Sequence, residues 1–178
     1  MEITTEVIKQ LRDETGVSVM QCKKALEKAE GDLEKAKVIL RKASAAIAGK
    51  KADRALGAGA AVAYTHAGSQ VVGAIVLACE TDFVSKNEEF VRLAYDIAMH
   101  VAAMSPAFVS RDDVKEDDIK AAREVFAKEV EKVPEAARAK ALEGKIDSYL
   151  GERVLLDQPF VKDPSTTVRQ LIDSAIQK

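Results

Sequence analysis

The sequence predicts an α+β fold, because its hydrophobic pattern changes twice along the chain. Helical periodicity fills the first part, short strand-like segments follow, and longer helical stripes occupy the remainder. We therefore expect an N-terminal three-helix module over 1–45, a linker over 46–60 and a core over 61–178 in which helices pack a small antiparallel sheet. Within the core, apolar residues recur at helical spacing on either side of a proline, and this pattern predicts a helical hairpin at about 114–151.

The N-terminal module is predicted from residues that start and stop helices. Gly16 supplies a stop for the first helix, and Ser18 with Gln21 matches a capping box at the start of the second. Gly31 then ends the second helix, and Asp32 can cap the third. Three helices in about forty residues form only a marginal core. We therefore expect this module to act as an adaptor surface rather than as a catalyst.

Composition argues against several classes of protein. The formal net charge is -2, and the +3 carried by residues 1–56 forms no concentrated basic stripe, so a direct nucleic-acid partner is not expected. No apolar run approaches the roughly 18 residues of a membrane span, and no secretory signal is present, so we expect a cytoplasmic protein without a membrane partner. Cys22 and Cys79 provide neither a disulfide framework nor a metal spacing, and we expect no metal and no cofactor.

The predicted sheet begins with two strand-like segments, 61–66 and 71–80, that flank a turn at 67–70. Both faces of the second segment are apolar, so we expect it to be central or covered by helices. Two strands alone are weakly stable, so a third strand is needed. The one candidate downstream is 154–156.

A long helix follows the sheet. Ser85 with Glu88 has the pattern of a capping box, so this helix should begin near Lys86, and Pro106 should end it. The hairpin helices that come next are separated by Pro134.

The last helix is expected after an extended segment, QPFVKDP. Asp163 would cap this helix, and Pro164 would take the favoured first position.

The segment Thr81-Asp82-Phe83-Val84 lies between the second strand and the long helix, and two interpretations of it are open. Phe83 either packs into the local core of an ordinary loop or projects as a docking residue. Asp82 beside it fits poorly in a dry core, because a buried carboxylate needs a partner. Val84 also lacks an apolar partner for a hydrophobic staple, since Glu89 occupies that position.

Val19 and Met20, at the start of the second helix, leave a similar choice. They are either core residues or an apolar knob that docks a partner. Arg12, Lys23 and Lys24 are, by pattern alone, an ordinary solvated face.

Three collinear segments carry a family resemblance: TGVSVMQCKKALEKAEGDLEKA, TDFVSKNEEF and LEGKIDSYLGERVLLDQPFVKDPSTTV. Each is similar to a block of the elongation factor Ts family, and together with the elements between them they cover essentially the whole chain. Each motif alone is moderately specific, but three in the right order make coincidence improbable.

The resemblance implies a non-enzymatic protein that makes a translational GTPase, elongation factor Tu, release GDP. In the family, the residues that correspond to Asp82 and Phe83 wedge between helices of the partner's nucleotide-binding domain and disturb its magnesium site. Thr81 and Val84 would shape the wedge. Losing the magnesium ion removes the largest neutralising charge near the diphosphate, so the affinity for nucleotide falls.

The resemblance implies a second contact with the same partner domain through the N-terminal module. Arg12, Val19, Met20 and Lys23 match the family's contact positions, and Val19 stands where a methionine is often found. The helical hairpin resembles the family's projecting arm, for which spacing assigns no partner contact.

The resemblance also implies a strand after the last helix, whereas this sequence ends at Ile176-Gln177-Lys178. Such a strand would be the third one that the hairpin of strands needs. The chain is therefore either truncated or completes its sheet in another way, for instance with another chain. A homodimer and a two-plus-two complex with the partner are the assemblies left open.

Two other classes of function remain, an enzyme and a generic adaptor. An enzyme is disfavoured because His66 and His100 are distant in sequence and Gly57-Ala58-Gly59 lacks the context of a phosphate-binding loop. A generic adaptor is the main alternative, because the N-terminal module resembles ubiquitin-associated domains in its pattern. The TDFV segment and the C-terminal block favour the exchange factor.

Overall fold

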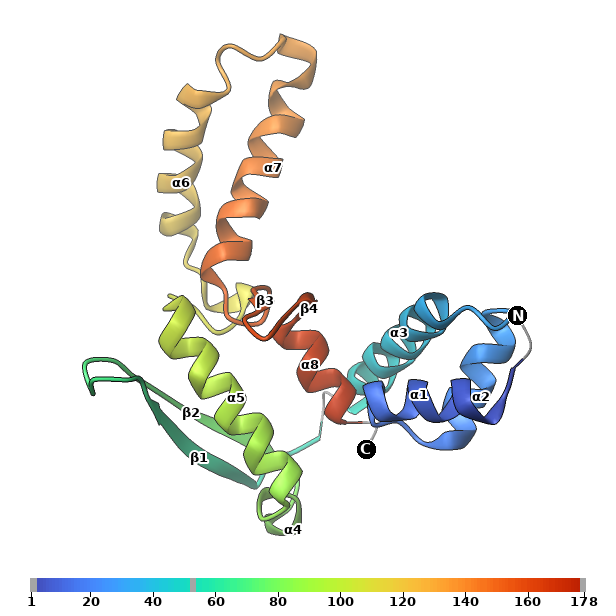
Figure 1. The fold of residues 1–178 in the computed structure, drawn as a ribbon. Helices are drawn as coiled ribbons and strands as arrows, with labels where there is room; N and C mark the ends of the chain where they lie inside the picture. Colours follow the sequence, from blue (N-terminus) through green and yellow to red (C-terminus); the bar gives the residue numbers. More distant parts are fainter. Residues whose placement is uncertain (1–2, 52–53, 177–178) are drawn as a thin grey trace. The chain divides into compact units, whose positions relative to one another are not determined.

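The computed structural model describes residues 3–51 and 54–176 and contains both helices and small sheets (Figure 1). The predicted α+β class is confirmed. The chain forms two compact units, each built from separate stretches of sequence. The first contains residues 1–60, 77–93 and 169–178, and the second contains 61–76 and 94–168.

The first three helices share one core. These helices are α1 (Thr5–Thr15), α2 (Val19–Lys28) and α3 (Leu33–Lys51). The buried side chains between them are Leu11, Val17, Cys22, Ala25, Leu26, Ala29, Ala36 and Leu40. The segment expected as a linker, 46–60, is helical as far as Lys51 and enters a strand at Ala58.

The predicted caps of these helices are present. The Ser18 hydroxyl accepts the Gln21 N–H at 3.4 Å and donates to the Gln21 side-chain oxygen at 2.8 Å. The Asp32 carboxylate accepts the Lys35 N–H at 3.0 Å. Gly16 ends α1 with a φ of 66°, a left-handed conformation that glycine adopts without strain.

Two strands, β1 (Ala58–Thr65) and β2 (Val72–Cys79), form a hairpin. The His66 N–H donates to the Val71 carbonyl at 2.9 Å, which closes the hairpin beside its turn. Ser69, in that turn, has a φ of 54°, so the turn requires left-handed backbone there.

The expectation that both faces of β2 are covered is wrong. Gly73 and Cys79 are buried on one face. The residues of the opposite face are exposed, and they are Val72, Ala74, Val76 and Ala78. Small apolar residues on both faces hid the alternation that usually reveals a half-exposed strand.

A single helix, α5 (Glu88–Met104), covers the inner face of the hairpin. A Cβ at Gly73 would lie 2.2 Å from the Ala98 carbonyl oxygen, so the backbone of the strand can approach the helix only because this residue is glycine. Tyr64 of β1 packs edge-on against Tyr95 of α5, with ring centroids 5.6 Å apart.

The candidate third strand, 154–156, does not join this hairpin. Val154 instead forms an isolated parallel bridge with Phe108, and the Leu155 N–H donates to the Phe108 carbonyl at 2.8 Å. Among the residues that the structure describes, the sheet of β1 and β2 has two strands.

The predicted helical hairpin is present as α6 (Glu116–Glu129) and α7 (Glu135–Arg153), joined at Pro134 (Figure 1). Phe126 and Tyr149 pack edge-on between the helices, with ring centroids 5.6 Å apart. The stripes of apolar residues therefore form the interface between two antiparallel helices, as their spacing predicts.

Arg111 lies in a short 3-10 turn (Arg111–Asp113) and forms ion pairs at the base of the α6–α7 hairpin. It donates to Asp147 of α7 at 2.6 Å and also bonds Asp157. These two carboxylates raise the pKa of the Arg111 guanidinium.

Asp163 does not cap the last helix, α8 (Val168–Ala175). Two short strands, β3 (Pro159–Phe160) and β4 (Asp163–Thr167), form an antiparallel pair before it. The Asp163 carboxylate accepts the Ser165 N–H at 3.1 Å, so it caps a local turn instead of a helix end.

His100 is completely buried on α5 and uses both ring nitrogens. The Val161 N–H donates to Nδ1 at 3.2 Å, so Nε2 carries the proton that is donated to Gln158 Oε1 at 2.9 Å. Burial lowers the pKa of His100 below its usual 6.5, and the hydrogen bond to Gln158 opposes part of that shift. The neutral imidazole therefore joins α5 to the segment around β3.

Stability should fall as His100 is forced to accept a proton. Because its pKa is lowered by folding, the unfolded chain binds more protons as the pH drops through 6.5, and the free energy of unfolding declines until the folded pKa is passed. Urea unfolding of the wild type at pH 7.5 and 5.5 should show this loss. His100→Gln, which cannot titrate, should show a smaller loss over the same interval whatever its absolute stability, and equal losses in the two proteins would contradict this role.

Candidate partner-binding site

The TDFV segment is one helical turn, α4 (Asp82–Ser85). Thr81 is its N-cap, and its hydroxyl oxygen accepts the Val84 N–H at 3.4 Å. The Thr81 carbonyl accepts the Ser85 N–H at 3.2 Å. The four residues are therefore held in a defined conformation.

The predicted start of the long helix is wrong by a few residues. Ser85 ends α4, and its hydroxyl donates to the Asp82 carbonyl at 2.9 Å. Asn87 caps α5 instead, because its side-chain oxygen accepts the Glu89 N–H at 2.8 Å. Thr81 and Asn87 are both good caps on either side of Ser85, and together they outweigh the capping-box pattern.

Phe83 projects from this turn. Its side chain is 83% exposed, and the neighbouring Val84 is also exposed. The interpretation of Phe83 as a local core residue is therefore wrong, and its role as a docking residue stays a prediction. An exposed phenylalanine on a capped turn offers a partner a large apolar group on a backbone whose conformation is already defined.

Asp82 stands beside Phe83 and is paired within the turn. Lys86 Nζ lies 2.8 Å from Asp82 Oδ2, and both side chains are exposed. Such an exposed pair contributes little to stability. Asp82 can exchange Lys86 for a donor of a partner at small cost.

The turn is fastened to the end of β2 by two further contacts. The Cys79 thiol donates to the Thr81 carbonyl at 3.2 Å, and this cysteine is only 6% exposed. Arg54 binds both carboxylate oxygens of Glu80, each at 3.0 Å. The contact between Cys79 and Thr81 and the ion pair of Glu80 therefore restrain the backbone just before α4.

The N-terminal candidates lie on α1 and α2. Arg12 is on α1, and Val19, Met20 and Lys23 are on the first turns of α2, all with exposed side chains. Met20 is 65% exposed and Val19 is 49% exposed. The interpretation of Val19 and Met20 as core residues is therefore wrong, and they form an apolar knob beside Lys23.

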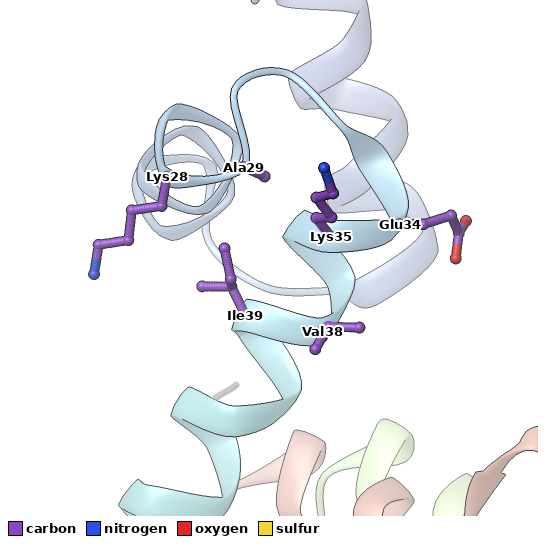
Figure 2. Close-up of a pocket in the computed structure, with 6 residues that line it drawn as sticks. All are labelled: Lys28, Ala29, Glu34, Lys35, Val38 and Ile39. Carbon is purple, nitrogen blue, oxygen red and sulfur yellow. The ribbon is translucent and has the colours of Figure 1, made fainter.

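A shallow pocket between the end of α2 and the first turns of α3 does not include these four residues. It is lined by Lys28, Ala29, Glu34, Lys35, Val38 and Ile39 (Figure 2). Ile39 points toward the end of α2, whereas Glu34 points away from the hollow. Glu34 instead binds Lys37 at 2.8 Å.

The two histidines both make hydrogen-bonding contacts within the fold. His66 Nδ1 lies 3.2 Å from the Tyr64 hydroxyl, and His100 holds its buried network. Over residues 3–51 and 54–176, no group of three or more His, Cys, Asp or Glu side chains is placed to hold a metal ion. None of the helices in this described part of the chain is both long and apolar enough to cross a membrane.

Sequence reasoning missed the residues that hold the site. The apolar pattern of the second strand gives no sign that the Cys79 thiol contacts Thr81. The capping-box pattern predicts Lys86 only as the start of a helix and not as the ion-pair partner of Asp82. The missing staple at Val84 was the one available signal that Ser85 does not begin that helix.

Comparisons with known proteins identify the family that the chain resembles. A profile of the family described as elongation factor Ts matches residues 3–178. A protein of Thermotoga neapolitana named elongation factor Ts is 43% identical over 178 residues, which cover 100% of this chain and 90% of that relative. Proteins with the same name from Coprothermobacter proteolyticus and Solibacter usitatus are each 42% identical, covering 99% of this chain and 90% and 84% of the relatives.

The matching family profile and the shared name of these relatives indicate a translation elongation factor. The chain belongs to the elongation factor Ts family. The match extends over both units, whereas a generic adaptor would share only the N-terminal helices.

Proposed function

We propose that this protein is a guanine-nucleotide exchange factor that binds elongation factor Tu in its GDP form and promotes the release of GDP. The observation that carries the proposal is the exposed Phe83, held on a capped helical turn. Membership of the family supports the choice of partner. No covalent chemistry is required of this chain.

The wedge acts through the partner's magnesium ion. Phe83 and Asp82 enter between helices of the nucleotide-binding domain, and the displaced helices disturb the magnesium site. Since the cation neutralises much of the diphosphate charge, the affinity for GDP falls when its coordination is lost. Thr81 holds the turn as its N-cap, and Val84 extends its apolar surface.

The exchange is reciprocal by thermodynamic linkage. If the factor lowers the affinity of its partner for GDP, then GDP lowers the affinity of the partner for the factor by the same ratio. Incoming nucleotide therefore displaces the factor, which can serve many partner molecules in turn.

The N-terminal module supplies a second contact with the same domain. Met20 and Val19 form the apolar part of this contact, and Arg12 and Lys23 add positive charge at its edges. This contact contributes binding energy before and after the wedge is inserted, so it governs affinity more than the rate of release.

The wedge is tested by Phe83→Ala. The variant loses the largest apolar group of the turn, so we expect the rate of release of a fluorescent GDP analogue from elongation factor Tu to fall by about tenfold or more. The assay contains magnesium and an excess of unlabelled GDP. Val109→Ala, which truncates another exposed apolar residue, is the matched control and should behave like wild type.

Circular dichroism must show that both variants are folded. Acceleration by Phe83→Ala equal to that of wild type would reject the wedge. Absence of acceleration by the wild-type chain, together with absence of binding, would reject the exchange function itself.

The N-terminal contact is tested by Met20→Ala. We expect the half-saturating concentration of factor to rise roughly fivefold, as for the loss of about 1 kcal/mol, while the release rate at saturation stays near that of wild type. A lower saturating rate with an unchanged half-saturating concentration would contradict the division of roles between the two contacts.

We further propose that the functional protein is a homodimer, alone or in a two-plus-two complex. The open face of the β1–β2 hairpin supports this assembly. Val76 is 73% exposed, and Val72, Ala74, Ala61 and Ala63 extend the same apolar face. A contiguous exposed patch of this kind usually marks an interaction surface.

The dimer is tested by Val76→Lys in sedimentation analysis. A charge at the centre of a buried apolar face is costly, so the variant should be monomeric at concentrations where the wild type is dimeric. Val109→Lys, which places the same charge elsewhere, should remain dimeric. A monomeric wild type would contradict the proposal.

A further inference from the structure

One backbone carbonyl takes part in two of the contacts that hold α4. The Thr81 carbonyl oxygen accepts the Ser85 N–H at 3.2 Å, which is the first helical hydrogen bond of the turn. The same oxygen accepts the Cys79 thiol at 3.2 Å. A carbonyl oxygen has two lone pairs and can accept both donors.

The cysteine is well placed to orient this carbonyl. Cys79 is the last residue of β2, and its side chain is buried on the inner face of the strand. The strand therefore fixes the sulfur, and the sulfur fixes the direction of the carbonyl two residues later. No exposed side chain could hold the carbonyl as firmly, because exposed side chains retain rotamer freedom.

The neighbouring ion pair is a weaker tie. Arg54 and Glu80 are both about half exposed, and exposed pairs contribute little. Their contact steadies the side of the chain that faces solvent. Arg54 donates to Glu80 and not to the Thr81 carbonyl, whereas the Cys79 thiol donates to that carbonyl directly.

We propose that Cys79 is a positioning residue of the exchange reaction: its thiol orients the Thr81 carbonyl and thereby holds Asp82 and Phe83 in the conformation that enters the partner. The kinetic part of this inference rests on the proposed exchange function. The structural part concerns the free protein and does not depend on any partner.

Two substitutions separate the hydrogen bond from the bulk of the side chain. Cys79→Ala removes the donor, and Cys79→Ser restores a donor of similar size. The saturating rate of GDP release should fall roughly threefold or more in the alanine variant, as for the loss of one hydrogen bond, with little change in half-saturating concentration. The serine variant should recover most of that rate.

A measurement on the free protein distinguishes this inference from the exchange function. The 13Cα chemical shifts of Asp82–Ser85 and the exchange rates of the Val84 and Ser85 amides report whether α4 is formed. Both should move toward unfolded values in Cys79→Ala and stay near wild type in Cys79→Ser. Cys22→Ala, which removes the other buried cysteine, is the control and should leave these signals unchanged.

Each outcome decides the matter. Wild-type signals of α4 in Cys79→Ala, or disordered signals in a folded Cys79→Ser, would overturn the proposal. Altered signals with an unchanged saturating rate would overturn its kinetic part. If the wild-type chain does not release GDP at all, the exchange function fails and the signals of α4 alone decide the role of the thiol. Should Cys79→Ala not fold, Cys79→Val fills the space without a donor and takes its place.

Discussion

A helix of four residues has too few internal hydrogen bonds to be stable on its own, because nucleation costs more than one turn returns. The turn that carries Phe83 exists only through contacts at its ends. Thr81 caps its first amides, Ser85 closes it with a hydroxyl, and Cys79 anchors it to β2. These contacts explain how the backbone that carries an exposed phenylalanine can keep a defined conformation. A flexible loop with the same sequence would lose ordering entropy each time it bound.

The rest of the described chain forms the packed elements that lie beneath the exposed surfaces. Gly73 lets β2 approach α5, and the buried His100 joins α5 to the β3 segment. These contacts rigidify the second unit around the open hairpin face and the helical hairpin. The N-terminal helices carry their own core and present Met20 outward. Each surface is therefore carried by a packed element. Such a surface can keep its own conformation while it displaces parts of a partner.

The sequence predicted the fold class and most helices, because periodicity and caps such as Ser18 and Asp32 act locally. The sequence-based prediction failed where two local capping signals competed or where tertiary packing determined the outcome. Ser85 and Asp163 both resemble helix caps, but Asn87 and the Ser165 turn compete with them successfully. The exposed face of β2 was hidden because its residues are as apolar as those of the buried face. For the site, position along the chain favoured Phe83 as a docking residue, whereas the thiol contact of Cys79 depends on a backbone bend that no spacing reveals.

We propose that Phe83 enters the nucleotide-binding domain of elongation factor Tu, and the most direct test places a photo-reactive phenylalanine analogue at position 83. Irradiation with elongation factor Tu and GDP, followed by mass spectrometry, identifies the contacted residues. We expect cross-links to helices of the nucleotide-binding domain, competed by the unlabelled wild-type chain, and none from the same analogue at position 109. Specific cross-links to another domain, or binding without any cross-link from position 83, would contradict it.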